Sequence, residues 1–143
     1  MTLNLELIQD MWNKDSVIDD VMLDNASLQI PQLHAKYISL HNEISLLSKK
    51  ASQELRTIEH KKWLYYSGKA PQSDYEDAPF DYKVIKSDVP HWVGVDASFL
   101  KVEMKLEYYG VMLHTLSDIL KQIHQMSFNI KNMIEWRRFV NGN

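Results

Sequence analysis

The fold is decided by residues 30–69, which read IPQLHAKYISLHNEISLLSKKASQELRTIEHKKWLYYSGK. Apolar side chains in the first part of this stretch recur at steps of three and four residues: Ile30, Leu33, Tyr37, Leu40, Ile44, Leu47 and Ala51. This spacing is typical of the seam of a coiled coil or of a long bundle helix. With Ser27 as the helix cap, Pro31 in the first turn and Gly68 as the stop signal, it predicts one long helix over residues 28–66.

A second stripe of the same kind lies downstream. Its members are Val102, Leu106, Tyr109, Leu113, Leu116, Leu120 and Ile123. A long helix can bury its stripe only against a partner of similar length, so we expect the helical region 98–140, opened by Asp96 or Ser98, to lie antiparallel to the first helix. The sequence therefore predicts an all-α fold of long antiparallel helices, forming one helical domain over residues 1–143.

A further apolar row is offset from the second stripe and consists of Met112, Ile119, Met126, Met133 and Val140. We interpret this row as a contact surface for another subunit, because an apolar helix face left over in one chain usually meets a second one. The oligomerisation residues predicted from it and from the following turns are Met112, Ile119, Met126, Ile130, Met133 and Ile134. The alternative is a core of three helices within one chain, completed by residues 3–12.

The segment between the two stripes, residues 68–97, is predicted to be an irregular loop. It contains the acidic run APQSDYEDAP and three prolines, which interrupt helices. Within it, Tyr82–Ile85 and Trp92–Val95, on either side of Pro90, have the composition to pair as a short β-hairpin.

Composition and missing motifs exclude several classes of function. The chain of 143 residues has no cysteine, which removes disulfides, thiolate nucleophiles and cysteine-ligated metals. It has no glycine-rich nucleotide-binding loop, and an enzyme built on His114 and His124 has no motif behind it. No signal peptide and no apolar run of about 18 residues is visible. We therefore expect a non-enzymatic protein of the cell interior, with no catalytic residues, metal, cofactor or membrane partner.

Charges are sorted into blocks along the chain. The net charge is −3, but residues 1–30 carry −5 and residues 72–81 carry −4, whereas residues 49–62 and 121–143 each carry +3. The first basic block leads into RTIEHKKWLYYSGK, where four permanent cations, a histidine and three aromatic rings lie within fourteen residues. Single-stranded nucleic acid is bound by this combination, since cations neutralise phosphates and flat rings stack on bases. The candidate nucleic-acid-binding residues are Arg56, His60, Lys61, Lys62, Trp63, Tyr65, Tyr66 and Lys69.

The same residues allow a second interpretation. Aromatic side chains at a helix end can belong to the core, with the lysine stems lying over them and the ammonium groups in water. The chain would then be a structural coiled-coil or assembly protein that does not bind DNA.

Four stretches, in the same order along the chain, resemble the UvsY recombination mediators of T4-like phages. They are DSVID at residues 15–19, LYYSG at 64–68 after basic residues, LKVE with LEYYGVML between residues 100 and 113, and FNIK at 128–131. The similarity runs from about Leu7 to Gly142, and only residues 70–95 are unaligned.

This resemblance implies a recombination mediator without enzymatic activity, acting in recombination, repair and recombination-dependent replication in the cytoplasm of the infected bacterial host. Its partners would be single-stranded DNA, bound without sequence preference, the phage RecA-like recombinase and the phage single-strand-binding protein. It would assemble with itself into a ring- or barrel-like oligomer of about six or seven subunits through its C-terminal region. The family's DNA-binding Lys and Arg correspond to His60 and Lys62, and Lys61 is an additional neighbouring cation. Histidine is mostly neutral at pH 7.

Overall fold

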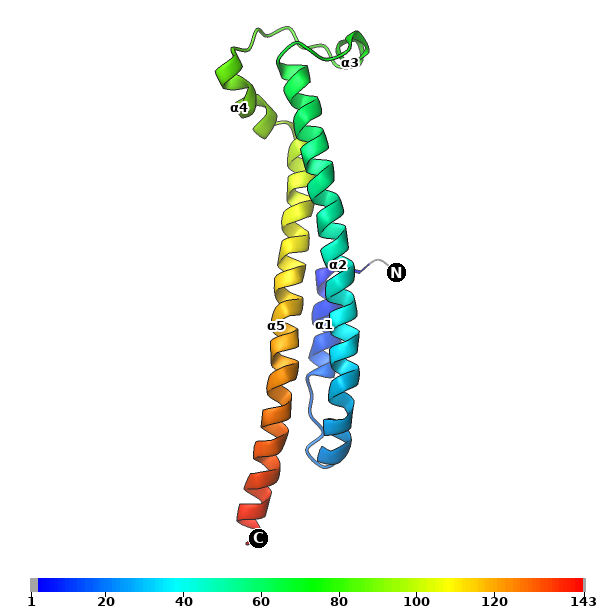
Figure 1. The fold of residues 1–143 in the computed structure, drawn as a ribbon, viewed down its shortest axis with the longest axis vertical. Helices are drawn as coiled ribbons and strands as arrows, with labels where there is room; N and C mark the ends of the chain where they lie inside the picture. The colour runs from blue at the N-terminus through cyan, green and yellow to red at the C-terminus, as the bar shows by residue number, and fades with distance from the viewer. Residues whose placement is uncertain (1–2, 143) are drawn as a thin grey trace. The chain divides into compact units, whose positions relative to one another are not determined.

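The structure is a computed structural model, and it describes residues 3–142. Its elements, in chain order, are α1 (Leu5–Asp15), α2 (Leu23–Tyr66), α3 (Gln72–Asp77), the short 3-10 helix η1 (Lys86–Asp88), α4 (Val89–Gly94) and α5 (Ala97–Val140) (Figure 1). Residues 3–142 contain no β-strand, so the predicted all-α fold is confirmed.

The β-hairpin prediction is wrong. Tyr82–Ile85 has no regular structure, and Trp92 lies in α4 instead of a strand. Pro90 explains the difference, because it stands in the first turn of α4. Its ring fixes a φ that suits a helix start, and it has no N–H to give to a strand ladder.

The first long helix begins earlier than predicted. Ser27 lies inside α2, and the chain turns into the helix at Asp19, whose carboxylate accepts the backbone N–H groups of Val21 and Met22 at 3.0 and 3.2 Å. The end agrees with the sequence. Gly68 has a φ of +79°, which a residue with a side chain rarely adopts.

Two backbone hydrogen bonds close this end of α2. The N–H of Lys69 donates to the carbonyl of Leu64, and the N–H of Gly68 donates to the carbonyl of Tyr65, at 2.9 and 3.3 Å. This is the Schellman pattern, which satisfies the last carbonyls of a helix. The basic and aromatic residues of interest therefore lie on the last turns of a well-terminated helix.

The chain divides into two compact units. Unit 1 comprises the described residues up to Ser45 and from Gly110 onward, and unit 2 comprises Leu46–Tyr109. Both long helices contribute to each unit, and the prediction of one domain over residues 1–143 stays a prediction.

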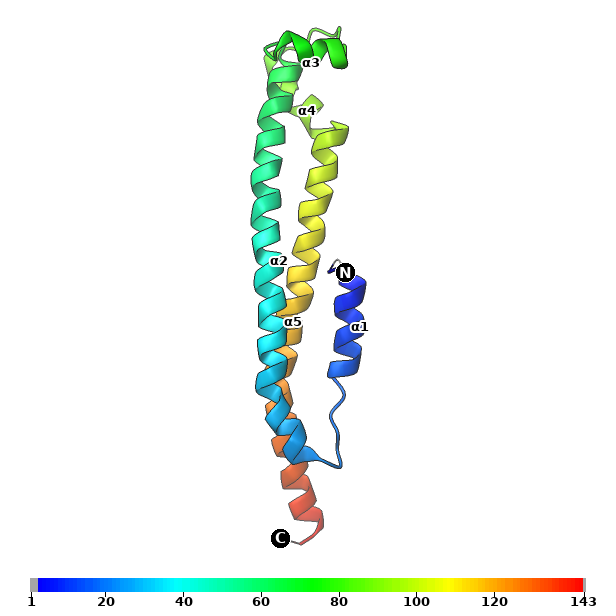
Figure 2. The same ribbon diagram turned by 90° about the vertical axis from the view of Figure 1, so that its right-hand side faces the viewer.

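Unit 1 contains three helical segments, namely α1, the first part of α2 and the second part of α5, which run alongside one another in Figures 1 and 2. Tyr37 of α2 is fully buried, its ring meets that of Trp12 edge-on at 5.5 Å, and its hydroxyl donates to Asp15 at 2.8 Å. Lys36 pairs with the same carboxylate at 2.6 Å. Ile8 of α1 is fully buried as well, so α1 belongs to the core of this unit.

The offset apolar row of α5 lies inside unit 1. Met112, Ile119, Met126 and Ile130 are at most 7% exposed, and Met133 packs against a cluster that includes Leu23 and Ala26. Of the six predicted oligomerisation residues, Ile134 alone is classed as exposed, at 38%. The row is apolar because three helical segments surround it within one chain. Most of the row is therefore covered within one chain, as the alternative interpretation expects, whereas its last member, Val140, is 61% exposed. The assignment of the row to self-association stays a prediction.

Unit 2 contains the second part of α2, the beginning of α5 and the segment between them with α3, η1 and α4. Its buried side chains come from all of these regions except α3 and η1: Ala51, Val89, Val93, Asp96 and Val102. The segment predicted as an irregular loop is thus partly helical and contributes Val89 and Val93 to the core. The candidate nucleic-acid-binding residues all lie in this unit.

Candidate nucleic-acid interface

The eight candidate residues fall into two groups by exposure. Arg56, His60, Lys61 and Lys69 are exposed, whereas Lys62, Trp63, Tyr65 and Tyr66 are half-buried. Arg56 and His60 are four residues apart, so they lie one above the other on the same face of α2. The exposed cations can contact a polyanion from the solvent side. The side chains of the half-buried residues are held in place by contacts within unit 2.

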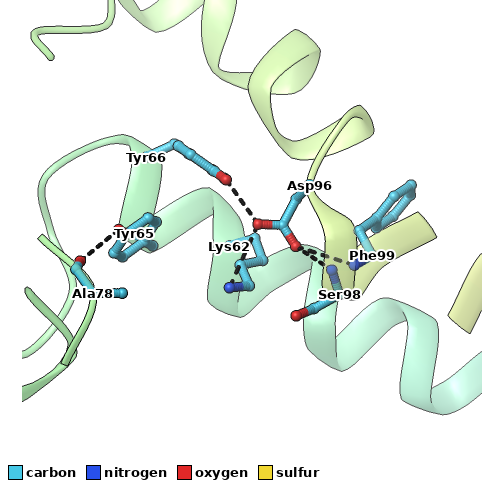
Figure 3. Close-up of polar contacts among 7 residues, drawn as sticks. All are labelled: Lys62, Tyr65, Tyr66, Ala78, Asp96, Ser98 and Phe99. Atoms are coloured by element: carbon cyan, nitrogen blue, oxygen red, sulfur yellow. Dashed lines mark hydrogen bonds and ion pairs between the residues drawn. The ribbon is translucent and has the colours of Figure 1, made fainter. Parts of the chain in front are cut away.

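Lys62 and Tyr66 both bind Asp96, as Figure 3 shows. The Tyr66 hydroxyl donates to Oδ2 of Asp96 at 2.7 Å, and Nζ of Lys62 lies 3.5 Å from the same oxygen. The other carboxylate oxygen accepts the backbone N–H groups of Ser98 and Phe99 at 2.9 and 3.1 Å. Asp96 therefore caps α5 with one oxygen and holds the end of α2 with the other.

The electrostatics of this contact favour the ionised carboxylate. Burial alone would raise the pKa of Asp96. Three contacts act in the opposite direction and outweigh burial: the hydrogen bond from Tyr66, the N–H of Phe99 and the Lys62 ammonium. The pKa of Asp96 therefore lies below the ordinary aspartate value. Burial and the bond to Asp96 raise the pKa of Tyr66. Lys62 is accordingly committed to a partner inside the chain and contributes less positive charge to the surface than Lys61.

Tyr65 and Tyr66 belong to an aromatic cluster, which we define as Tyr65, Tyr66, Tyr75, Phe80, Tyr82 and Trp92. Tyr65 stacks on Tyr75 with ring centres 5.2 Å apart, and Tyr66 meets Phe80 edge-on at 5.1 Å. The hydroxyl of Tyr65 donates to the carbonyl of Ala78 at 2.6 Å (Figure 3). The two tyrosines thus attach the segment after α2 to the helix end, and their rings are occupied by neighbouring rings.

Trp63 lies outside this aromatic cluster. Nζ of Lys69 lies 5.1 Å from the centre of its ring, which is a cation–π distance. A groove beside the ring is lined by Arg56, Glu59, His60 and Trp63 and has a volume of about 350 Å³. Trp63 is therefore the candidate aromatic residue that is surrounded by exposed cations.

A second cavity places acidic and basic residues together. It is lined by Lys61, Lys62 and Tyr65 of α2 and by Asp74, Asp77 and Ala78 of the following segment. The two carboxylates lower the positive potential on this side of the helix. Arg56, His60 and Lys69 do not line this cavity.

Two further features of the described residues concern metal binding and membrane spans. Across residues 3–142 no group of three or more histidine, aspartate or glutamate side chains is arranged to hold a metal ion. In the same range no helix has an apolar stretch long enough to cross a membrane. His114 pairs with Asp118 at 3.3 Å on the surface of α5, and this pair lies in a different unit from the basic residues.

Sequence reasoning found the cations and one function of Asp96 but missed its contacts with α2. The sequence predicts either Asp96 or Ser98 as the cap of the second long helix, and the bonds from the N–H groups of Ser98 and Phe99 identify Asp96. Its contact with Tyr66 joins residues 30 positions apart, and no local pattern marks such a pair. The partners Tyr75, Phe80 and Trp92 were missed for the same reason, although their aromatic character was the available signal.

The fold and this surface define the class: an all-helical protein that carries an exposed row of cations beside an aromatic ring. The chain belongs to the UvsY family, whose model, described as "Recombination, repair and ssDNA binding protein UvsY", matches residues 11–143. The resemblance inferred from the four sequence stretches is thereby confirmed, and the chain is a member of a family of phage recombination proteins.

Individual relatives agree with this assignment. The recombination protein UvsY of Enterobacteria phage T4 is 25% identical over 140 residues, which cover 98% of this chain and 99% of the relative. A crystal structure of the bacteriophage T4 recombination mediator protein UvsY matches with a TM-score of 0.86 at 26% identity, over 98% of this chain and 99% of that one. A second crystal form of that protein matches with a TM-score of 0.82 at 25% identity, over 92% and 96%.

Proposed function

We propose that this protein is a recombination mediator that binds single-stranded DNA without sequence preference and helps to load a RecA-like recombinase onto DNA covered by single-strand-binding protein. The observation that carries the proposal is the row of exposed cations at the end of α2, in a chain of the UvsY family. Cations on a helix surface neutralise phosphates and do not read base edges, which suits binding without sequence preference.

The DNA contact rests mainly on Arg56, His60, Lys61 and Lys69. Lys62 takes a supporting role because its ammonium group lies 3.5 Å from Asp96. The Tyr65 and Tyr66 side chains hold the segment after α2 in place and so position the cations.

Self-association explains how a chain of net charge −3 binds a polyanion. In a ring, the same basic surface is repeated around the symmetry axis, and the acidic N-terminal block can lie elsewhere. The apolar side chains available for this contact are those exposed at the end of α5: Phe128, Ile134, Trp136, Phe139 and Val140. The second copy of the chain is the occupant we propose, since these side chains, which include Val140 from the end of the offset row, form the exposed apolar surface at the end of the C-terminal helix.

The place of action is the cytoplasm of the infected bacterium, where recombinase and single-strand-binding protein meet on DNA. A mediator exchanges one protein for another and performs no chemistry, so no cofactor is required. Its stimulation of the recombinase should be greatest when the DNA is already covered.

The experiment combines a binding titration with a loading assay. Labelled oligo(dT) is titrated at low salt, and recombinase ATPase activity is then followed on bare and on covered DNA. We expect binding, and stimulation that is larger on covered DNA. Absence of binding at low salt would favour a structural assembly protein, and equal stimulation on both substrates would contradict the mediator function.

His60→Lys is expected to strengthen DNA binding. His60 is exposed beside Arg56, and the resemblance places a lysine at this position. A permanent cation adds one phosphate contact per engaged subunit, which steepens the slope of log affinity against log salt by about 0.7 and tightens binding about fivefold at 0.1 M salt. Anisotropy titrations over a range of salt concentrations measure both quantities. The control is His34→Lys, an exposed position of α2 in unit 1; an equal gain there would refute the assignment of position 60.

A further inference from the structure

Three separate grooves meet at the side chain of Trp63. One is lined by Arg56, Glu59 and His60, a second by residues that include Pro90, Val93 and Phe99, and a third by residues that include Lys69, Val84 and Val89. Trp63 is half-buried, so part of the indole is covered by the chain while another part borders open space. A ring that is supported on one side and accessible on another is held still at little entropic cost when a ligand arrives.

The other candidate rings are already used. Tyr65 lies between Tyr75 and Tyr66, with ring centres 5.2 and 5.0 Å away, and its hydroxyl is bonded to Ala78. Tyr66 meets Phe80 and bonds to Asp96. A nucleobase could stack on either ring only after neighbouring rings had moved away. Trp63 requires no such rearrangement.

The charges around the open groove indicate which part of a nucleotide it would hold, the base or the phosphate. Arg56 and His60 stand at its border, and Lys69 lies over the indole but does not line this groove. Glu59 also lines it, and its carboxylate would repel a phosphate placed inside. The groove is shallow and open to solvent, which leaves one face of the indole accessible to a flat ring.

We propose that the groove formed by Arg56, Glu59, His60 and Trp63 is a nucleobase subsite, in which one base of a bound single strand stacks on Trp63 while neighbouring phosphates meet Arg56 and Lys69. The subsite rests on the proposed function, since it needs a single strand along α2. The subsite adds a stacking contact to the phosphate contacts. The free energy of this contact depends on the presence of a base and not on the salt concentration.

The test compares two ligands on matched variants of the full chain. Oligo(dT) and an abasic deoxyribose-phosphate oligomer of equal length are titrated against wild type, Trp63→Leu, Trp63→Phe and the control Trp12→Phe. Leucine keeps the apolar bulk needed by the packed side of Trp63 but removes the ring. Trp12 lies on α1 in unit 1 and belongs to neither the basic surface nor the exposed apolar end of α5, so its replacement controls for the loss of any tryptophan, and phenylalanine keeps a ring beside Tyr37. Thermal unfolding followed by circular dichroism verifies that each variant is folded.

We expect wild type and Trp12→Phe to bind oligo(dT) roughly tenfold more tightly than the abasic oligomer, within the range measured for loss of a stacked base. Trp63→Leu should lose this preference while keeping its affinity for the abasic oligomer and its salt slope, and Trp63→Phe should keep part of it. Retention of the full preference by Trp63→Leu would overturn the subsite, as would equal binding of both ligands by wild type; in either case the proposed function stands. If wild type binds neither ligand at low salt, both proposals fail.

Discussion

Simultaneous replacement of Arg56, Lys61 and Lys69 by alanine is expected to lower the affinity for single-stranded DNA by about two orders of magnitude at 0.1 M salt. Each phosphate contact to a single strand contributes about 0.7 to the slope of log affinity against log salt, so three contacts amount to roughly 2 log units between 0.1 and 1 M salt. All three side chains are exposed, and surface substitutions of this kind usually change stability by no more than about 0.5 kcal/mol. Anisotropy titrations of labelled oligo(dT) measure the affinity and the slope.

The control for this triple variant removes the same charge elsewhere. Lys121, Lys131 and Arg138 are exposed on the part of α5 that lies in unit 1. Their replacement by alanine should leave the salt slope within error of wild type. If the two triple variants lose equal affinity, DNA binding depends on total charge and not on the surface at the end of α2.

Asp96→Ala is expected to lower the free energy of unfolding by about 2–4 kcal/mol. The loss of a helix cap costs about 0.5–2 kcal/mol, and an unpaired hydroxyl at Tyr66 adds about 1–3 kcal/mol when it is shielded from water. Asp96 is only 8% exposed, so water replaces its contacts poorly. Urea unfolding followed by tryptophan fluorescence measures the change, because Trp63 and Trp92 report on the same unit.

Asp96→Asn is the matched control for this substitution. Asparagine keeps the cap through its single side-chain oxygen, but its NH2 group replaces the oxygen that accepts from Tyr66 and attracts Lys62. The Tyr66 hydroxyl can turn to accept from this NH2 group, so we expect a cost of about 1–2 kcal/mol, smaller than that of alanine. The wild-type chain should show a related pH dependence. The lowered pKa of Asp96 means that its contribution to stability is present above the ordinary aspartate pKa and is lost as the pH falls through the lowered value. Equal stability of the alanine and asparagine variants at pH 7 would contradict this role of Asp96.

The long helices could be predicted from the sequence because their signals are local. Steps of three and four residues place Tyr37, Ile44 and Ala51 on one side of α2, and all three are buried. Gly68 could be recognised as the helix end because the positive φ needed there is a property of that one residue and favours glycine. The start of α2 was predicted five residues too late, since Asp19 turns the chain before the apolar pattern begins.

Features that depend on distant residues could not be predicted in the same way. The offset row containing Met112 and Ile119 has the same pattern whether it is covered by α1 and α2 of its own chain or by another subunit. The stretch around Pro90 satisfies the composition of a strand as well as that of a short helix, and packing of Val89 and Val93 decides between them.

The candidate site shows the same division. The cations Arg56, Lys61 and Lys69 are exposed, as a basic surface requires. The aromatic residues separate into Trp63, which borders a groove, and the tyrosines, which hold the following segment in place. Sequence spacing alone makes Trp63 and the two tyrosines equally good candidates for stacking on a base. The difference arises from the rings that pack against the tyrosines, which come from residues 75–92.

The central claim is that single-stranded DNA lies along the end of α2 in unit 2. Photo-cross-linking tests it most directly: an oligonucleotide carrying 5-iodouracil is bound to the wild-type protein at low salt, irradiated and digested, and the cross-linked peptides are identified by mass spectrometry. The account predicts that the adducts fall within residues 56–69 and disappear when the salt concentration is raised. Adducts confined to residues 121–142, or none under conditions in which the oligonucleotide is bound, would contradict it.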